Sequence, residues 1–342
     1  MIRTIALVLG STAAAAAAVP AITGAGASFP APLYTAWASA YRARTGQPLS
    51  YQAIGSGGGI KQIRAGTVDF GATDRPLKAA ELAASGLYQF PTVIGGVVPI
   101  INLPGLRAGR LKLDGRILAD IFLGKVTRWN DPEVQRANPQ LRLPRVPITV
   151  VHRSDGSGTS FLLTSFLAMT SREWAARVGA GEAVAWPTGL GGKGNDGIAA
   201  FVKQTTGAIG YVEYAYARQN NATHALVCNR AGHCPIPAAA SFGAAAAGAS
   251  WAAAPGNDVL LLDQPDEGAW PITGATFLLI HRRQEYPQTA AAVLGFADWA
   301  FRSGDAVAAK LGYVPLPAPV KALIRRQWAD VTAGGKPVYV PL

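Results

Sequence analysis

The chain has 342 residues, of which 49% are hydrophobic and 15% charged, and its formal net charge is +11 at pH 7. This composition excludes a disordered chain, and the length suits two folded lobes better than one hydrophobic core. Basic residues stand singly or in pairs, with no basic run and no aromatic RNA-binding motif. An ordinary charged surface or a small anionic ligand is therefore favoured over nucleic acid as the reason for the positive charge.

The N-terminal residues 1–21 predict a cleaved signal peptide. Arg3 is followed by an alanine-rich apolar stretch that ends in Val19-Pro20-Ala21, a small-residue pattern suited to signal peptidase. A buried N-terminal helix is the alternative. The stretch is too short and too rich in alanine for a membrane anchor, which takes ~20 strongly apolar residues. We therefore expect an exported, soluble protein that lies outside the cytoplasm and does not insert into the membrane.

The rest of the chain alternates between strand and helix signals, which is typical of an α/β fold with parallel strands. Pro30 begins a helix whose apolar spacing at Leu33, Trp37 and Tyr41 predicts one buried face. The apolar run 91–102 predicts a strand that crosses from one lobe to the other. The other predicted elements are strands from Ile22 and over 49–54, 68–72, 148–152, 207–212 and 277–281, helices over 60–65, 117–123, 317–328 and from Ser160, and loop with weak helix over 235–256.

Two cysteines, Cys228 and Cys234, are separated by five residues that include a glycine. In an oxidising compartment this spacing predicts a small disulfide loop. Two free thiols, or a metal site shared with His224 and His233, are the alternatives, although the spacing matches no standard zinc pattern.

Three turns rich in glycine and serine stand where helices begin, at residues 26–29, 55–58 and 155–159. The first turn of a helix presents unpaired N–H groups and partial positive charge, so such turns form anion sites. Arg153 stands just before the third turn, and its planar guanidinium can hold two oxygens of a tetrahedral anion. Each turn on its own is typical of a plain helix cap. Arg153 on its own is typical of a surface or salt-bridged arginine. Together they predict an anion site.

Asp74 follows a predicted strand and would be repelled by a fully ionised anion. An ionised carboxylate only accepts hydrogen bonds, so it suits a ligand that still carries a proton. Phosphate carries one at neutral pH and sulfate does not, which favours phosphate. The alternatives for Asp74 are an Asx-turn before Pro76 or an ion pair with Arg75.

Six motifs together resemble the periplasmic phosphate-binding proteins of bacterial phosphate-specific ABC transporters. The motifs lie in order over most of the chain and are Thr23-Gly-Ala-Gly-Ala-Ser-Phe-Pro-Ala-Pro32, Ile54-Gly-Ser-Gly-Gly-Gly59, Val68-Asp-Phe-Gly-Ala-Thr-Asp74, Arg153-Ser-Asp-Gly-Ser-Gly-Thr-Ser160, Gly189-Leu-Gly-Gly-Lys-Gly-Asn-Asp-Gly-Ile198 and Gly207-Ala-Ile-Gly-Tyr-Val-Glu-Tyr214. The resemblance implies a type 2 periplasmic-binding fold of two α/β lobes, each with a mixed or parallel sheet flanked by helices, joined by two crossing strands that act as a hinge. Lobe 1 would hold residues 22–93 and 265–342, and lobe 2 residues 94–264.

The resemblance also implies which residues meet the ligand and which partners the protein has. The implied phosphate ligands are Ser28, Phe29, Ser56, Asp74, Arg153, Ser157, Gly158 and Thr159, and Asp155 would orient Arg153. Inorganic phosphate and the membrane permease subunits are the implied partners, with no cofactor, no metal and a monomeric state. Two positions depart from the family pattern, because Ser28 stands where threonine is common and Arg75 where a small residue is frequent.

Two other classes of function remain open at this point. A phosphatase or serine hydrolase would need a metal cluster or an activated nucleophile, but the four histidines form no HExxH-like motif and neither Ser56 nor Ser157 lies in a Gly-x-Ser-x-Gly elbow. The Gly189–Gly194 stretch lacks the spacing of a nucleotide-binding P-loop. A binding protein for sulfate, molybdate or arsenate is the other alternative, and Asp74 argues against the first two.

Overall fold

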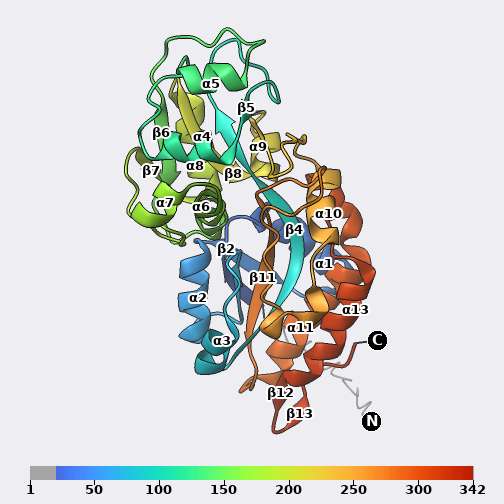
Figure 1. Cartoon of the computed structure of the whole chain (residues 1–342). Coiled ribbons are helices and arrows are strands. Elements are labelled where there is room, and N and C mark those ends of the chain that lie inside the picture. The colour runs from blue at the N-terminus through green and yellow to red at the C-terminus, as the bar shows by residue number, and fades with distance from the viewer. Residues whose placement is uncertain (1–20, 342) are drawn as a thin grey trace, which may run out of the picture.

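The structure is a computed structural model that describes residues 21–341. The predicted signal peptide therefore lies outside the described residues, apart from Ala21. Figure 1 shows two halves, a green one above and a blue, orange and red one below. Within the described range, no helix combines the length and the apolar character needed to cross a membrane.

The sheet runs through both halves in the order β2-β1-β3-β11-β4-β8-β6-β7. The lower half holds three neighbouring parallel strands and one antiparallel strand, and the upper half holds three parallel strands. The bounds are β1 (Ile22–Gly26), β2 (Leu49–Ala53), β3 (Phe70–Thr73) and β11 (Thr273–His281) below, and β6 (Thr149–Arg153), β7 (Leu190–Gly192) and β8 (Ala208–Glu213) above. The predicted α/β class is confirmed, and the sheet is mixed, because β11 pairs antiparallel with β3 and β4 pairs antiparallel with β11 and β8.

Strand β4 (Leu87–Ile101) belongs to both halves (Figure 1). Its residues are buried throughout, which explains the continuous apolar run that the sequence shows. Residues 87–96 pair with β11 and residues 97–101 pair with β8. Strand β11 begins at this changeover, where Thr273 pairs with Gly96, and stays in the lower half.

Helices cover both faces of the sheet. Those of the lower half are α1 (Ala31–Thr45), α2 (Ser56–Arg64), α3 (Ala79–Ser85), α11 (Pro287–Ser303), α12 (Asp305–Leu311) and α13 (Ala318–Gln327), and those of the upper half are α4 (Gly115–Phe122), α5 (Pro132–Ala137), α6 (Gly158–Thr170), α7 (Arg172–Arg177), α8 (Gly194–Gln204) and α9 (Tyr214–Gln219). The buried face of α1 includes Leu33, Trp37 and Tyr41, as the spacing predicts. Pro30 is the N-cap of α1 and not its first residue.

The segment from α10 (Ala239–Ala247) to residue 258 packs beside elements of lobe 1. The side-chain amide of Gln89 donates to the carbonyl of Gly256 (2.8 Å), and that of Asn257 donates to the carbonyl of Gln89 (2.9 Å). The ammonium of Lys78 pairs with Asp258 at 2.6 Å. We propose that the chain returns to lobe 1 before residue 256 and not at residue 265.

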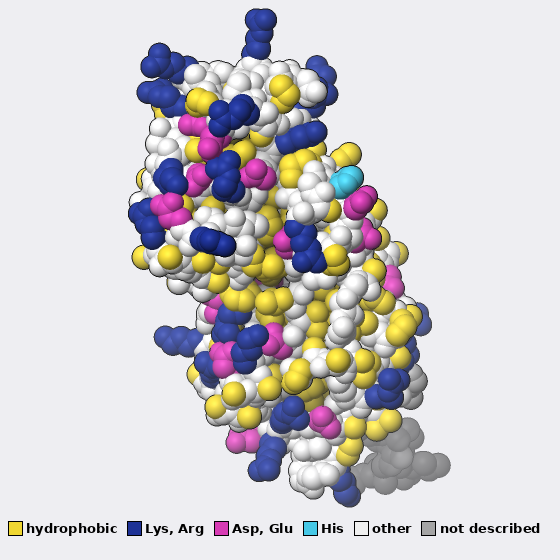
Figure 2. Space-filling view, viewed as in Figure 1, with side chains coloured by type: hydrophobic (Ala, Val, Ile, Leu, Met, Phe, Trp, Pro, Cys, Tyr) yellow, Lys and Arg dark blue, Asp and Glu magenta, His cyan; other side chains and the backbone are white. Residues whose placement is uncertain are grey.

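Charged side chains are dispersed over the surface. Figure 2 shows Lys and Arg on both halves of the visible face, with Asp and Glu among them, and no single basic stripe on that face. Cys228 and Cys234 form a disulfide just after β10 (Leu226–Val227). The two sulfurs are bonded to each other, so neither is a metal ligand.

Candidate anion-binding site

The predicted site residues come from strand ends that face each other across the two halves. In lobe 1, β1, β2 and β3 are parallel neighbours, and Ser28, Ser56 and Asp74 follow their carboxyl ends. In lobe 2, Arg153 ends β6, and Ser157 caps the helix α6 that comes next. Ligands of open α/β sheets bind at the carboxyl ends of strands. The sheet topology therefore places the lobe 1 residues and the lobe 2 residues of the predicted site at the same interface between the lobes.

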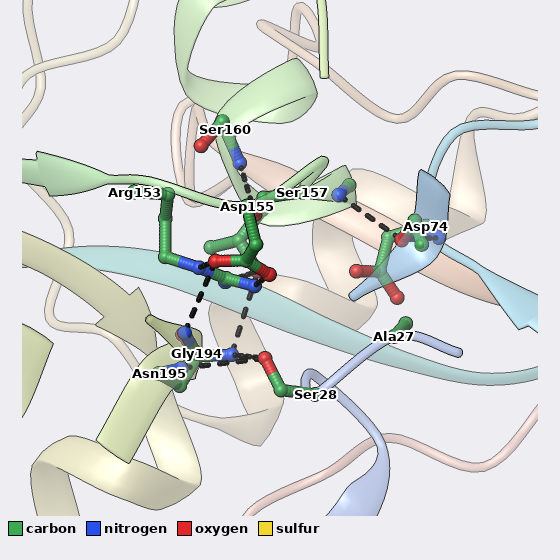
Figure 3. Close-up of polar contacts among 12 residues, drawn as sticks. Ala27, Ser28, Asp74, Arg153, Asp155, Ser157, Ser160, Gly194 and Asn195 are labelled. Carbon is green, nitrogen blue, oxygen red and sulfur yellow. Dashed lines mark hydrogen bonds and ion pairs between the residues drawn. The ribbon is translucent and has the colours of Figure 1, made fainter. Parts of the chain in front are cut away.

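The side chains of this site are removed from solvent. Ser28, Ser56, Asp74, Arg153 and Ser157 are each exposed by 3% or less. Figure 3 shows Arg153 and Asp155 side by side, with Gly194, Asn195 and Ser28 below them and Asp74 on the opposite side. Phe29, Gly158 and Thr159 are also buried at this location, so the structure brings the whole predicted set together.

Ser56 links the two lobes through its hydroxyl. Its Oγ accepts from the N–H of Asp74 at 3.2 Å and from the N–H of Gly158, in the other lobe, at 3.0 Å. The cap of α2 is Gly55 and not Ser56. A hydroxyl oxygen that accepts twice still has its own hydrogen to donate, so Ser56 bridges the two lobes rather than capping α2.

Ser157 is the one predicted turn serine whose side chain does cap a helix. Its Oγ accepts from the N–H of Ser160 at 3.0 Å at the start of α6. The partial positive charge of the first turn of α6 is thereby held facing Asp74 and Ser56. Gly158 allows this approach, since a Cβ there would lie 2.6 Å from the Cβ of Asp74.

Ser28 and Phe29 lie in a turn whose carbonyls are held by three tyrosines. Tyr51 donates to the carbonyl of Ala27, Tyr216 to that of Ser28 and Tyr313 to that of Phe29, each at 2.7 Å. In a trans peptide the N–H points opposite to the preceding carbonyl, and the described residues contain no cis peptide. The N–H groups of Ser28 and Phe29 therefore point away from Tyr51 and Tyr216 respectively, where they can donate to a ligand.

Arg153 and Asp155 form a bidentate ion pair. The Nε of Arg153 donates to Asp155 at 2.7 Å and its Nη2 donates at 2.5 Å, while Nη1 reaches the hydroxyl of Thr159 at 3.5 Å. Burial raises the pKa of Asp155, but the hydrogen bonds and the charge of Arg153, together with backbone N–H donors, leave that pKa below its ordinary value. Asp155 also accepts from the N–H of Gly194 at 3.1 Å. The guanidinium is thus fixed in orientation.

One carboxylate oxygen of Asp74 accepts a hydrogen bond from the protein, and the other does not. Its Oδ1 accepts from the hydroxyl of Thr276 at 2.7 Å, whereas Oδ2 is buried and has no hydrogen-bond partner. Burial raises the pKa of Asp74 to about 7, although Thr276 and Arg153 oppose this shift. A buried acceptor without a partner is destabilising, so Oδ2 is suited to a ligand that donates a hydrogen bond.

The two alternatives for Asp74 are wrong. Arg75 pairs with Glu81 at 3.1 Å and with Glu182 at 2.9 Å, and not with Asp74. The turn before Pro76 is instead closed by Thr73, whose hydroxyl accepts from the N–H of Arg75 at 3.1 Å.

Sequence reasoning gave no role to two buried residues of the site. Asn195 donates from Nδ2 (2.9 Å) and from its backbone N–H (3.3 Å) to the Oγ of Ser28, and so links the lobes. Thr276 is the partner of Asp74. Asn195 stands inside the Gly189–Ile198 motif, which could have drawn attention to it, whereas Thr276 stands in the apolar strand β11 without any local signal.

The fold and the site together define a two-lobed binding protein with a buried set of hydrogen-bond donors between its lobes. Residues 11–303 match the model of the PBP superfamily domain. The chain is 52% identical to the phosphate-binding protein PstS of Pasteurella multocida over 94% of this chain and 93% of that one. It is 51% identical to the protein of the same name from Haemophilus influenzae, over 90% of this chain and 92% of that one.

A solved structure shows the same fold. The phosphate-binding protein of Stenotrophomonas maltophilia aligns with a TM-score of 0.70 at 24% identity, over 94% of this chain and 96% of that one. The chain belongs to the family of phosphate-binding PstS proteins within the PBP superfamily.

Proposed function

We propose that this protein binds inorganic phosphate between its lobes and delivers it to the membrane permease of a phosphate ABC transporter. The observation that carries the proposal is the buried, unpartnered Oδ2 of Asp74. The donors and positive charge near this oxygen are the hydroxyl of Ser56, the first turn of α6 and the guanidinium of Arg153. A tetrahedral anion that keeps one proton satisfies both kinds of group.

The hydroxyls of the site support binding rather than hydrolysis. Both Ser56 and Ser157 accept hydrogen bonds from backbone N–H groups, and in the described part of the chain neither is bonded to a histidine. A nucleophilic serine requires an adjacent base. The relatives at 51–52% identity are themselves named for binding phosphate.

Titration calorimetry of the purified protein with phosphate, sulfate and arsenate tests the function. We expect one phosphate per chain and sulfate binding weaker by roughly 10³-fold or more, because a site built around a ligand hydrogen rejects an analogue that lacks it. Arsenate carries the same proton and should compete weakly. Equal affinity for phosphate and sulfate would contradict the proposal, as would steady hydrolysis of a phosphate ester by the same sample.

Gly158→Ala should weaken phosphate binding by at least about tenfold. The added methyl would lie 2.6 Å from the Cβ of Asp74 and 2.6 Å from the Oγ of Ser56, both in the opposite lobe. The lobes would then have to stay apart by enough to accommodate it. Gly243→Ala in α10 is the matched control, since nothing lies within 4 Å of its new methyl. An unchanged dissociation constant for Gly158→Ala would show that the lobes do not close on the ligand at this point.

We also propose a periplasmic location and a monomeric state. The disulfide between Cys228 and Cys234 is typical of an oxidising compartment, and the sequence of residues 1–21 predicts export. The permease subunits would then meet the closed protein at the membrane surface.

A further inference from the structure

Arg75 and Glu182 join the two lobes beside the site, and neither has a role in the function proposed above. Arg75 follows Asp74 after β3 in lobe 1, and Glu182 lies after α7 in lobe 2. The Nε of Arg75 donates to the Oε2 of Glu182 at 2.9 Å, and the two side chains are 21% and 16% exposed. A partly desolvated pair of this kind interacts more strongly than an exposed ion pair.

The lobe 1 end of this pair is fixed independently of lobe 2. Both terminal nitrogens of Arg75 donate to Glu81, with distances of 3.1 to 3.3 Å. Glu81 lies in α3 and also accepts from the N–H of Lys78 at 2.9 Å. Arg75 is therefore already oriented in lobe 1, so that little side-chain entropy is lost when Glu182 approaches.

The lobe 2 end is attached to the anion cradle. The carbonyl of Glu182 accepts from the N–H of Ser157 at 2.9 Å, so the loop that carries Glu182 moves with the first turn of α6. The other carboxylate oxygen of Glu182, Oε1, is buried without a partner. Arg75 is the cation that balances this carboxylate in the closed form.

Glu182 is unfavourable for the closed form if Arg75 is absent. Its charge acts on Asp74 as a like charge; Asp74 is buried and the side chain of Glu182 is only 16% exposed when the lobes meet. When the lobes separate, water can solvate Glu182 again. Removing Arg75 therefore penalises the closed form more than the open form.

We propose that Arg75 and Glu182 form an interlobe latch that holds the closed, ligand-retaining form and slows phosphate release without contacting the ligand. The latch rests on the proposed function, since phosphate is the ligand whose release it slows. Its effect falls on the dissociation rate, because the pair forms only after the ligand has entered and the lobes have met.

Stopped-flow release of phosphate from wild type, Arg75→Ala, Glu182→Gln and the double variant tests the latch. We expect each single variant to release phosphate about tenfold faster, the double variant to release it no faster than the singles, and the ratio of phosphate to sulfate affinity to stay unchanged. Arg116→Ala is the matched control, because it removes an arginine whose ion pairs with Asp120 (3.3 Å) and Glu133 (2.8 Å) both lie within lobe 2.

The outcomes separate the latch from the function. If wild type binds no phosphate, the proposed function fails. If wild type binds phosphate but both single variants release it at the wild-type rate, or if the two effects add fully in the double variant, the latch is wrong and the function stands. Glu182→Gln keeps the shape of the side chain, so its rate of phosphate release tests the latch even if Arg75→Ala folds poorly.

Discussion

Arg153→Ala should weaken phosphate binding by about 10²- to 10⁴-fold, since removing one member of a buried charge pair costs about 3–5 kcal/mol. Arg153 is 3% exposed and supplies the side-chain positive charge of the site. Its loss leaves the anion without that charge and leaves the Asp155 carboxylate without its charged partner, while the N–H of Gly194 still donates to it. Calorimetry with phosphate measures the change.

Arg153→Lys is the matched variant for this prediction. Lysine keeps the charge but cannot bind Asp155 through two nitrogens as the guanidinium does. We therefore expect a loss of affinity between those of wild type and Arg153→Ala. Circular dichroism should show that all three proteins are folded. Near-native affinity of a folded Arg153→Ala protein would remove Arg153 from the site.

Asp74→Asn should relax the rejection of sulfate. The carboxylate oxygen Oδ2 accepts no hydrogen bond within the protein, and an amide NH₂ in its place can donate to a fully ionised oxyanion. Oδ1 can still accept from Thr276. A hydrogen bond to a charged group contributes about 1.5–3 kcal/mol. The ratio of phosphate to sulfate affinity should therefore fall by roughly tenfold or more.

The same residue predicts a pH dependence with a definite sign. Burial raises the pKa of Asp74 to about 7, so below that pH the carboxyl group holds its own proton and can donate to sulfate. Rejection of sulfate by wild type should therefore weaken as the pH falls below 7, while Asp74→Asn should show no such change. Asp305→Asn, which alters a surface pair with Lys321, is the control. Sulfate rejection that is equally strong in Asp74→Asn and wild type would disprove this account of selectivity.

The sequence predicted the elements that carry their own local signal. The apolar spacing of α1, the glycine-rich turn before α6 and the long apolar run of β4 all depend on residues close together in the chain, and each was located to within a few residues. The turn predicted at 55–58 is wrong beyond Gly55, because α2 begins at Ser56 and includes the glycines that follow. The predicted ligand residues also lie together, because each follows a strand end.

The parts that could not be predicted depend on contacts between distant residues. Ser28 looked like a helix cap, but its oxygen accepts from Asn195, which is 167 positions away. Thr276 supports Asp74 from a strand whose sequence is otherwise apolar. Arg75 was an unexplained departure from the family pattern until the structure showed Glu182 across the interface. No local sequence pattern indicates whether a side chain will contact its own lobe or the other one.

The continuity of β4 limits how the protein can move. Because this one strand is hydrogen-bonded to β11 on one side of Gly96 and to β8 on the other, sliding the lobes would break both ladders, whereas bending at the changeover keeps them. The ring of Phe29 lies against Gly95, so the ligand turn sits beside this pivot. Rotation about this hinge displaces the nearby ligand turn little and the far ends of the lobes much more. The separation between the far ends of the two lobes should therefore change most when the site is filled.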